Sequence, residues 1–94
     1  MAKLGIGAEF RAMHHGDKAF VIPNPWDVGS AKLLEGLGFK ALATTSSGFA
    51  VSIGKRDGGT TLDEVIAHCQ DLVEASSLPV SADLEKGYGD RPED

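Results

Sequence analysis

The sequence predicts an α/β fold built on a parallel sheet, and three observations support this. Short runs of apolar or small residues alternate with longer helical patterns. The runs are almost continuously apolar, as strands are when both faces of their sheet are covered. The segments between them are roughly ten residues or longer, which suits crossover helices and exceeds what a hairpin needs. We therefore expect about three parallel strands with crossover helices and an N-terminal helix.

Length and charge bound the domain count and the partners. The chain has 94 residues, of which 41% are hydrophobic, enough for one small core and too few for two. Residues 1–94 should thus form a single α/β segment. With 9 basic and 14 acidic residues the net charge is −5, and no cluster of Lys and Arg marks a nucleic-acid surface. We expect no nucleic-acid partner.

Neither a secretory signal nor a membrane span is evident. Residues 1–9 lack the apolar stretch of a signal peptide, and no run approaches the roughly 18 apolar residues of a spanning helix. We expect a cytoplasmic protein without a membrane partner. Cys69 is the only cysteine, which excludes an internal disulfide, and its position in a helical apolar pattern favours a packing role.

The first third of the chain predicts one helix and one strand. Residues 4–15 carry Leu4, Phe10 and Met13 at loosely helical spacing, and Gly16 should end that helix. Residues 19–22 form a compact β-prone run. The Pro-Asn-Pro sequence that follows cannot continue a central strand, so the first strand should end there.

A helix and a second strand should follow. Asp27 can cap a helix, and Gly38 can end it in a left-handed turn. The apolar residues of this helix are Val28, Ala31, Leu34 and Leu37. Residues 41–45 read as the second strand, and the Gly- and Ser-rich residues 46–60 as a loop.

The next predicted helix begins at Thr61. Thr61 and Glu64 form a capping box, in which each side chain satisfies a backbone donor of the other residue. Six apolar residues then fall on one continuous helical stripe, namely Leu62, Val65, Ile66, Cys69, Leu72 and Val73. His68 neighbours this stripe, and we expect it to face solvent. Residues 78–83 should form the third strand.

Polar loops follow all three expected strands. In parallel sheets ligands bind outside the carboxyl ends of the strands, so residues 23–27, 46–60 and 85–90 should share one candidate site. Asp83 and Glu85 lie on one face if the third strand continues that far. Such a pair suits Mg²⁺, which commonly takes one or two carboxylates. A solvated acidic turn is the alternative.

Four segments of the chain carry a family resemblance. They are residues 23–32, 44–50, 54–57 and 79–89. Together they resemble the isocitrate lyase and phosphoenolpyruvate mutase superfamily, in its phosphonomutase-like branch. The resemblance implies a TIM (β/α)8 barrel, of which this chain would be the amino-terminal third, because such barrels need about 250 residues. It also implies Mg²⁺, a small α-keto-acid or enolpyruvate-type carboxylate as substrate, and chemistry at a C–C or P–C bond beside the carbonyl.

The same resemblance assigns roles to individual residues. It places the substrate carboxylate on Ser47 and Gly48, with Phe49 beside them. It makes Asp57 a catalytic acidic residue on a mobile loop near the metal, although Arg56 stands where relatives often have proline.

The third loop would supply the metal site. The resemblance makes Asp83 the principal metal ligand and Glu85 a second carboxylate, which would act through a bound water. Gly87, Tyr88 and Gly89 would form the turn beneath the site. Lys86 has no role that follows from the sequence.

Two functional hypotheses stay open. The chain carries part of a Mg²⁺-dependent lyase or mutase for small keto-acid carboxylates, or it is a truncated, catalytically inactive fragment. A sheet of three strands would leave two edges and an apolar face uncovered, features that promote pairing between chains. We therefore expect a homo-oligomer.

Overall fold

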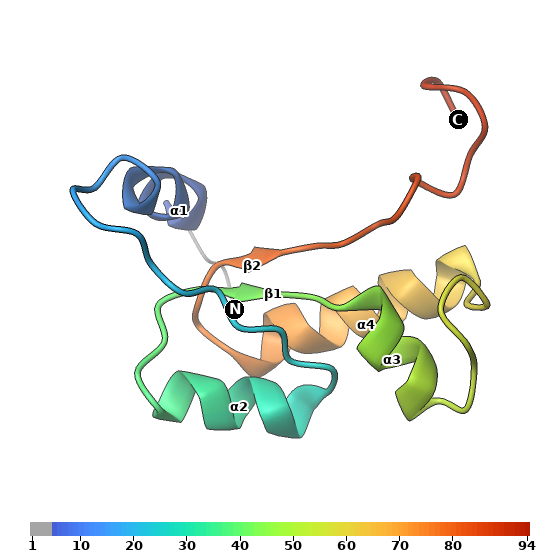
Figure 1. Ribbon diagram of the computed structural model, residues 1–94, viewed down its shortest axis with the longest axis horizontal. Helices are drawn as coiled ribbons and strands as arrows, with labels where there is room; N and C mark the ends of the chain where they lie inside the picture. Colours follow the sequence, from blue (N-terminus) through green and yellow to red (C-terminus); the bar gives the residue numbers. More distant parts are fainter. Residues whose placement is uncertain (1–4) are drawn as a thin grey trace.

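The computed structural model describes residues 5–94 and shows two parallel strands with four helices. Their order is α1 (Ile6–Met13), α2 (Val28–Gly36), β1 (Leu42–Ala43), α3 (Ser46–Ser52), α4 (Leu62–Ala75) and β2 (Val80–Ser81). β1 pairs with β2 in parallel, with Leu42 opposite Val80. Helices α2 and α4 lie together on one side of the strands (Figure 1). The predicted α/β class is confirmed.

The core lies between the two strands and helices α2 and α4. Ala31 of α2, Leu42 of β1 and Leu72 of α4 are completely buried and contact one another. Burying a leucine side chain contributes about 1.5–3 kcal/mol, so these few contacts are the main apolar stabilisation of the layer. Around this cluster pack Leu34, Ala75, Leu78 and Val80.

The first predicted strand is wrong, and proline chemistry explains why. Residues 19–26 have no strand, although the Pro23 carbonyl accepts a hydrogen bond from the Ala43 N–H at 3.0 Å. In a parallel ladder the Ala43 carbonyl would then accept from the backbone N–H of residue 25. Residue 25 is proline and has no N–H. The Asn24 side chain donates to the Ala43 carbonyl instead, at 3.1 Å.

Helices α2 and α4 begin where the sequence predicts because both carry capping boxes. Ser30 N–H donates to the Asp27 carboxylate at 2.7 Å, and Glu64 N–H donates to the Thr61 hydroxyl at 3.2 Å. Each box satisfies backbone donors that a helix start leaves unpaired. Gly38 follows α2 with φ +97°, the left-handed conformation predicted for it.

The buried face of α4 differs from the predicted stripe. Its buried residues are Val65, His68 and Leu72, whereas Ile66 and Val73 are 46% and 39% exposed. The expectation that His68 faces solvent is wrong. The helix contacts α2 with one face and α3 with the adjacent face, so its buried arc turns toward His68.

The remaining helices refine two further expectations. Residues 46–60 are not wholly a loop, because Ser46–Ser52 forms α3 with Thr45 as its N-cap. Helix α1 covers Ile6–Met13 of the expected 4–15, and Leu4 lies outside the described residues. Within residues 5–94, no helix has the length and apolar character needed to cross a membrane.

The bond from Asn24 generates a test. We expect Asn24→Ala to lower the free energy of unfolding by about 1 kcal/mol, the typical contribution of one hydrogen bond, because the Ala43 carbonyl loses its donor. Urea unfolding followed by circular dichroism measures this change. Lys18→Ala, at an exposed position of the same segment, is the control and should stay within about 0.5 kcal/mol of wild type. Equal stability of the two variants would contradict the role of Asn24.

Candidate functional site

Two carboxylates from distant loops meet one hydroxyl group at the carboxyl ends of β1 and β2. The Ser46 hydroxyl donates to Asp83 Oδ2 at 3.1 Å and lies 3.3 Å from Asp57 Oδ1. Ser46 opens α3 just after β1, and Asp83 follows β2, so the parallel pairing of the strands brings them together (Figure 1). The expected gathering of polar loops at this edge includes Asp57 and Asp83.

Two hydrogen bonds fix Asp83, one at its backbone N–H and one at its carboxylate. Asp83 N–H donates to the Thr44 hydroxyl at 2.7 Å, and Glu85 N–H donates to Asp83 Oδ1 at 3.0 Å. The Glu85 N–H lowers the pKa of Asp83 most, and the Ser46 hydroxyl lowers it further, because both donors stabilise the anion. The side chain is exposed and ionised at neutral pH. It is therefore a fixed, charged oxygen ligand facing solvent.

The donor set fits a hard divalent cation. Ser46 has a single hydroxyl proton, which cannot satisfy Asp57 and Asp83 together, and no ion pair within residues 5–94 includes either carboxylate. Mg²⁺ takes one or two protein carboxylates and completes its shell with water and substrate oxygens. Residues 5–94 hold no cluster of three His, Cys, Asp or Glu side chains, so an all-protein cage is not formed within this part.

Glu85 does not lie as its position after a continuous strand would place it. β2 ends at Ser81, and Glu85 adopts φ +53°, so the alternation of faces does not reach it. The structure brings its backbone N–H onto Asp83, while its carboxylate accepts a hydrogen bond from the Tyr88 hydroxyl at 2.6 Å. A role for Glu85 at a metal, directly or through water, stays a prediction.

The turn after Asp83 contacts the loop that carries Asp57, through Tyr88 and Thr60. Gly87 N–H donates to the Leu84 carbonyl at 2.8 Å, with Gly87 at φ +87° and Tyr88 at φ +62°. A left-handed conformation costs a non-glycine residue about 1–2 kcal/mol, so other contacts must hold Tyr88 there. Its hydroxyl lies 3.3 Å from the Thr60 hydroxyl and donates a hydrogen bond to Glu85. The bond to Glu85 is the largest of the effects that raise the pKa of Tyr88.

The loop that carries Asp57 is anchored on both sides. Before Asp57, Lys55 forms an ion pair with Glu64 of α4 at 2.7 Å, which lowers the Glu64 pKa. After it, Thr60 contacts Tyr88. These contacts restrain the loop near Ser46, whereas the Asp57 side chain itself is exposed.

The three residues assigned to the substrate carboxylate lie in the first turn of α3. Gly48 N–H donates to the Thr45 hydroxyl at 3.2 Å as part of the helix cap. A Cβ added at Gly48 would meet Thr45 Cγ2 at 2.8 Å, so glycine is required by packing. Ser47 is exposed, and Phe49 is half-buried against His68.

Sequence reasoning missed several side chains that organise this edge. Ser46 and Thr44 belong to a run of four hydroxyl residues at the end of β1, and the family resemblance assigns a role only to Ser47 among them. That run was the available signal, because hydroxyls at a strand's carboxyl end face the ligand edge. Thr60 offered no such signal, since its contact with Tyr88 spans 28 positions of the sequence.

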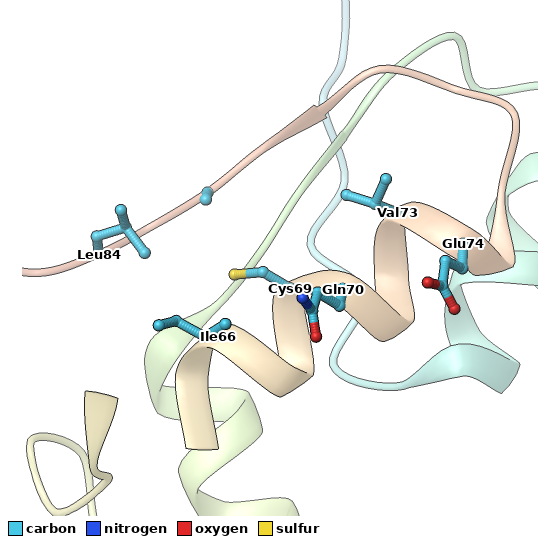
Figure 2. A pocket seen from close by; sticks show the side chains of 7 residues that line it. Ile66, Cys69, Gln70, Val73, Glu74 and Leu84 are labelled. Carbon is cyan, nitrogen blue, oxygen red and sulfur yellow. The ribbon is translucent and has the colours of Figure 1, made fainter. Parts of the chain in front are cut away.

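A separate hollow lies between α4 and the segment after β2. Its lining is largely apolar and includes Ile66, Cys69 and Val73 of α4 with Leu84 across from them (Figure 2). Its volume is about 370 Å³. Burial raises the pKa of the Cys69 thiol, which disfavours the reactive thiolate and agrees with a packing role. We call this hollow the α4 groove; its apolar character separates it from the carboxylate site.

Comparison with known proteins identifies the family. The model of the phosphoenolpyruvate phosphomutase family matches residues 10–94, and the chain belongs to that family. It is 41% identical over 85 residues to an uncharacterised protein of Mycobacterium tuberculosis, covering 89% of this chain and 33% of that protein. It is 34% identical over 88 residues to the 2,3-dimethylmalate lyase of Eubacterium barkeri, covering 92% and 30%. The chain thus spans about a third of these relatives.

Solved structures agree with the family assignment. A lyase/mutase-type protein of Burkholderia cenocepacia superimposes with a TM-score of 0.94 at 52% identity, over 97% of this chain and 33% of that one. A structure of 2,3-dimethylmalate lyase, described as a member of the phosphoenolpyruvate mutase and isocitrate lyase superfamily, gives 0.79 at 35% identity, over 90% and 31%. The resemblance seen in the sequence is confirmed.

The shared hydroxyl of Ser46 can be tested by titration. We expect Ser46→Ala to raise the pKa of Asp83, because the anion loses one of its donors. Carboxyl ¹³C chemical shifts followed against pH report this pKa directly. Ser47→Ala removes the neighbouring exposed hydroxyl and serves as the matched control, with the wild-type titration expected. An unchanged Asp83 titration in Ser46→Ala would show that the contact is absent in solution.

Proposed function

We propose that this chain carries the first part of the active site of a Mg²⁺-dependent lyase or mutase for small α-keto-acid or enolpyruvate-type carboxylates. The observation that supports it most is the meeting of Asp57 and Asp83 on Ser46 at the carboxyl ends of parallel strands. Relatives in the family are named 2,3-dimethylmalate lyase and 2-methylisocitrate lyase, names that describe enzymes acting on carboxylic acids.

We also propose that the chain forms the first strands and helices of a TIM (β/α)8 barrel. Parallel pairing of β1 and β2, with α2 and α4 on one side of them, is the arrangement of consecutive units in such a barrel (Figure 1). In that architecture active sites form at the carboxyl ends of the strands, where Ser46 and Asp83 lie.

The roles of the residues follow from their chemistry. Asp83, with Asp57 and with Glu85 through water, would hold the cation, because ionised carboxylates are the oxygen ligands that Mg²⁺ prefers. When bound, the cation would act as a Lewis acid on the oxygen of the substrate's keto or enolate group. The Ser47 hydroxyl and the first turn of α3, at the positive end of the helix, would bind and orient the substrate carboxylate.

Calorimetry with Mg²⁺ and oxalate tests this proposal. Oxalate is a dianion that imitates the enolate of a keto acid, and we expect it to bind wild type only when Mg²⁺ is present. Asp83→Asn removes the charge with little change of shape, and we expect it to weaken Mg²⁺ binding on the order of tenfold or more. Asp17→Asn, in the exposed turn after α1, is the control for net charge and should bind as wild type does.

Two results would count against the metal site. Absence of heat from wild type at millimolar Mg²⁺ would remove the support for a site in this chain. Equal Mg²⁺ affinities of Asp83→Asn and Asp17→Asn would show that the cation binds elsewhere.

The α4 groove favours a second candidate, that the chain associates with copies of itself. The groove is lined by partly exposed apolar side chains, among them Ile66 and Leu84, both 46% exposed. It adjoins β2, which within residues 5–94 has a strand on one side only. An open strand edge beside an apolar surface promotes pairing between chains.

Sedimentation velocity at micromolar concentration tests self-association. We expect wild type to sediment as dimers or larger species, and Leu84→Glu to sediment as a monomer, because a charge in the α4 groove opposes its burial. Val21→Glu places the same charge on an apolar side chain that is 67% exposed outside the groove, and should leave association unchanged. A monodisperse wild-type monomer would contradict this candidate.

A further inference from the structure

We propose that His68 is a positioning residue for the turn that binds the substrate carboxylate. Its neutral imidazole, stacked on Phe49, holds the first turn of α3 against α4, and protonation of the ring releases that turn. The link to a substrate rests on the proposed function, whereas the mechanical coupling of His68 to α3 does not.

The stack is close and nearly parallel. The ring centroids of Phe49 and His68 are 3.9 Å apart, with 13° between the ring planes. His68 is only 7% exposed, so the contact is enclosed by the protein. Contacts between aromatic rings stabilise the residues that carry them beyond the area that they bury.

Helix α3 depends on such a contact. With only seven residues, Ser46–Ser52 is far shorter than the roughly 12–15 residues at which isolated helices become marginally stable. Its order must therefore come from the N-cap at Thr45 and from packing, to which Ala50 and Phe49 contribute. Phe49 directly follows Gly48, so a shift of its ring moves the turn that includes Ser46 and Ser47.

The ring is tolerated in this position because it is neutral. Its Nε2 is buried and has no hydrogen-bond partner within residues 5–94. A neutral imidazole can present one nitrogen as an acceptor, but the imidazolium carries N–H groups on both. Protonation would therefore bury a charged donor without an acceptor, which costs far more than an unpaired neutral nitrogen.

The charges around the ring only partly offset this cost. Burial lowers the pKa of His68, while Asp71 on α4 and Asp27 ahead of α2 raise it, and burial is the largest of these effects. Helix α3 has no titratable side chain. With its pKa below the ordinary 6.5, the folded protein binds fewer protons than the unfolded chain. The ring's contribution to stability is full above that value and declines as pH falls toward the folded pKa.

Amide exchange and chemical shifts of α3 measure the coupling without a ligand. Between about pH 8 and 5, the interval in which histidine changes charge, we expect the Ser46–Ser52 amide shifts to titrate with the His68 ring. His68→Phe keeps the stack and removes the titration, so its α3 amides should stay protected throughout. His68→Leu loses the stack, and we expect its exchange in α3 to be about tenfold faster than in wild type above the His68 pKa, because local opening becomes easier. Below that pKa the two proteins should exchange alike. Helix α2 should be unaffected.

A control variant at another histidine and a binding measurement complete the test. His15→Phe changes an exposed histidine and should leave the titration of α3 intact. The positioning role is wrong if α3 does not follow the His68 titration in wild type, or if His68→Leu protects α3 as wild type does. Oxalate with Mg²⁺ should bind wild type more weakly below the His68 pKa than above it. Its affinity for His68→Phe should be the same on both sides of that pKa.

These measurements separate the two proposals. Failure of oxalate to bind wild type, with α3 still following His68, would overturn the proposed function and leave the coupling supported. Oxalate binding that keeps the same pH dependence in His68→Phe as in wild type would support the proposed function and overturn the role of His68 in it.

Discussion

The parallel pairing of β1 with β2 is the constraint on which the site depends. Leu42 N–H donates to the Pro79 carbonyl at 2.9 Å and Thr44 N–H to the Ser81 carbonyl at 2.8 Å, which fixes the register of the two strands. In this register Thr44 lies next to Asp83, and the Asp83 N–H donates a hydrogen bond to the Thr44 hydroxyl. A shift of one residue would turn the Asp83 side chain to the other face and away from Ser46. Val80 of β2 opposes such a shift, because its side chain packs against the core and would turn away from it.

Around this pair of strands, side-chain contacts rather than regular structure hold the loops. The loop with Asp57 is tied to α4 through Lys55 and to the turn after Asp83 through Tyr88. A partly buried ion pair and one hydroxyl contact each contribute little on their own, so the loop is held by their combination. Such a loop can stay close to Ser46 and still adjust when a cation and a substrate bind.

The surroundings of α4 show how one helix serves both the core and the site. Leu72 packs in the core, and His68, one turn earlier on the same face, supports α3. The neighbouring face of the helix, with Ile66 and Cys69, lines the α4 groove. Because the helix meets three different surroundings, its apolar pattern is wider than one buried face, which is why the predicted stripe and the buried residues differ.

The sequence alone determined the fold class, the family and the caps of α2 and α4. It also identified Asp57 and Asp83 as candidate site residues, because all of these follow from local patterns and motifs. The tertiary structure decided what depends on distant partners. The first strand does not form because the Ala43 carbonyl faces a proline. His68 is buried because Phe49 of another helix stacks on it. Ser46 connects the two carboxylates through contacts with residues 11 and 37 positions away. The apolar periodicity of the sequence does not predict such contacts, since they arise only when packing brings separate segments together.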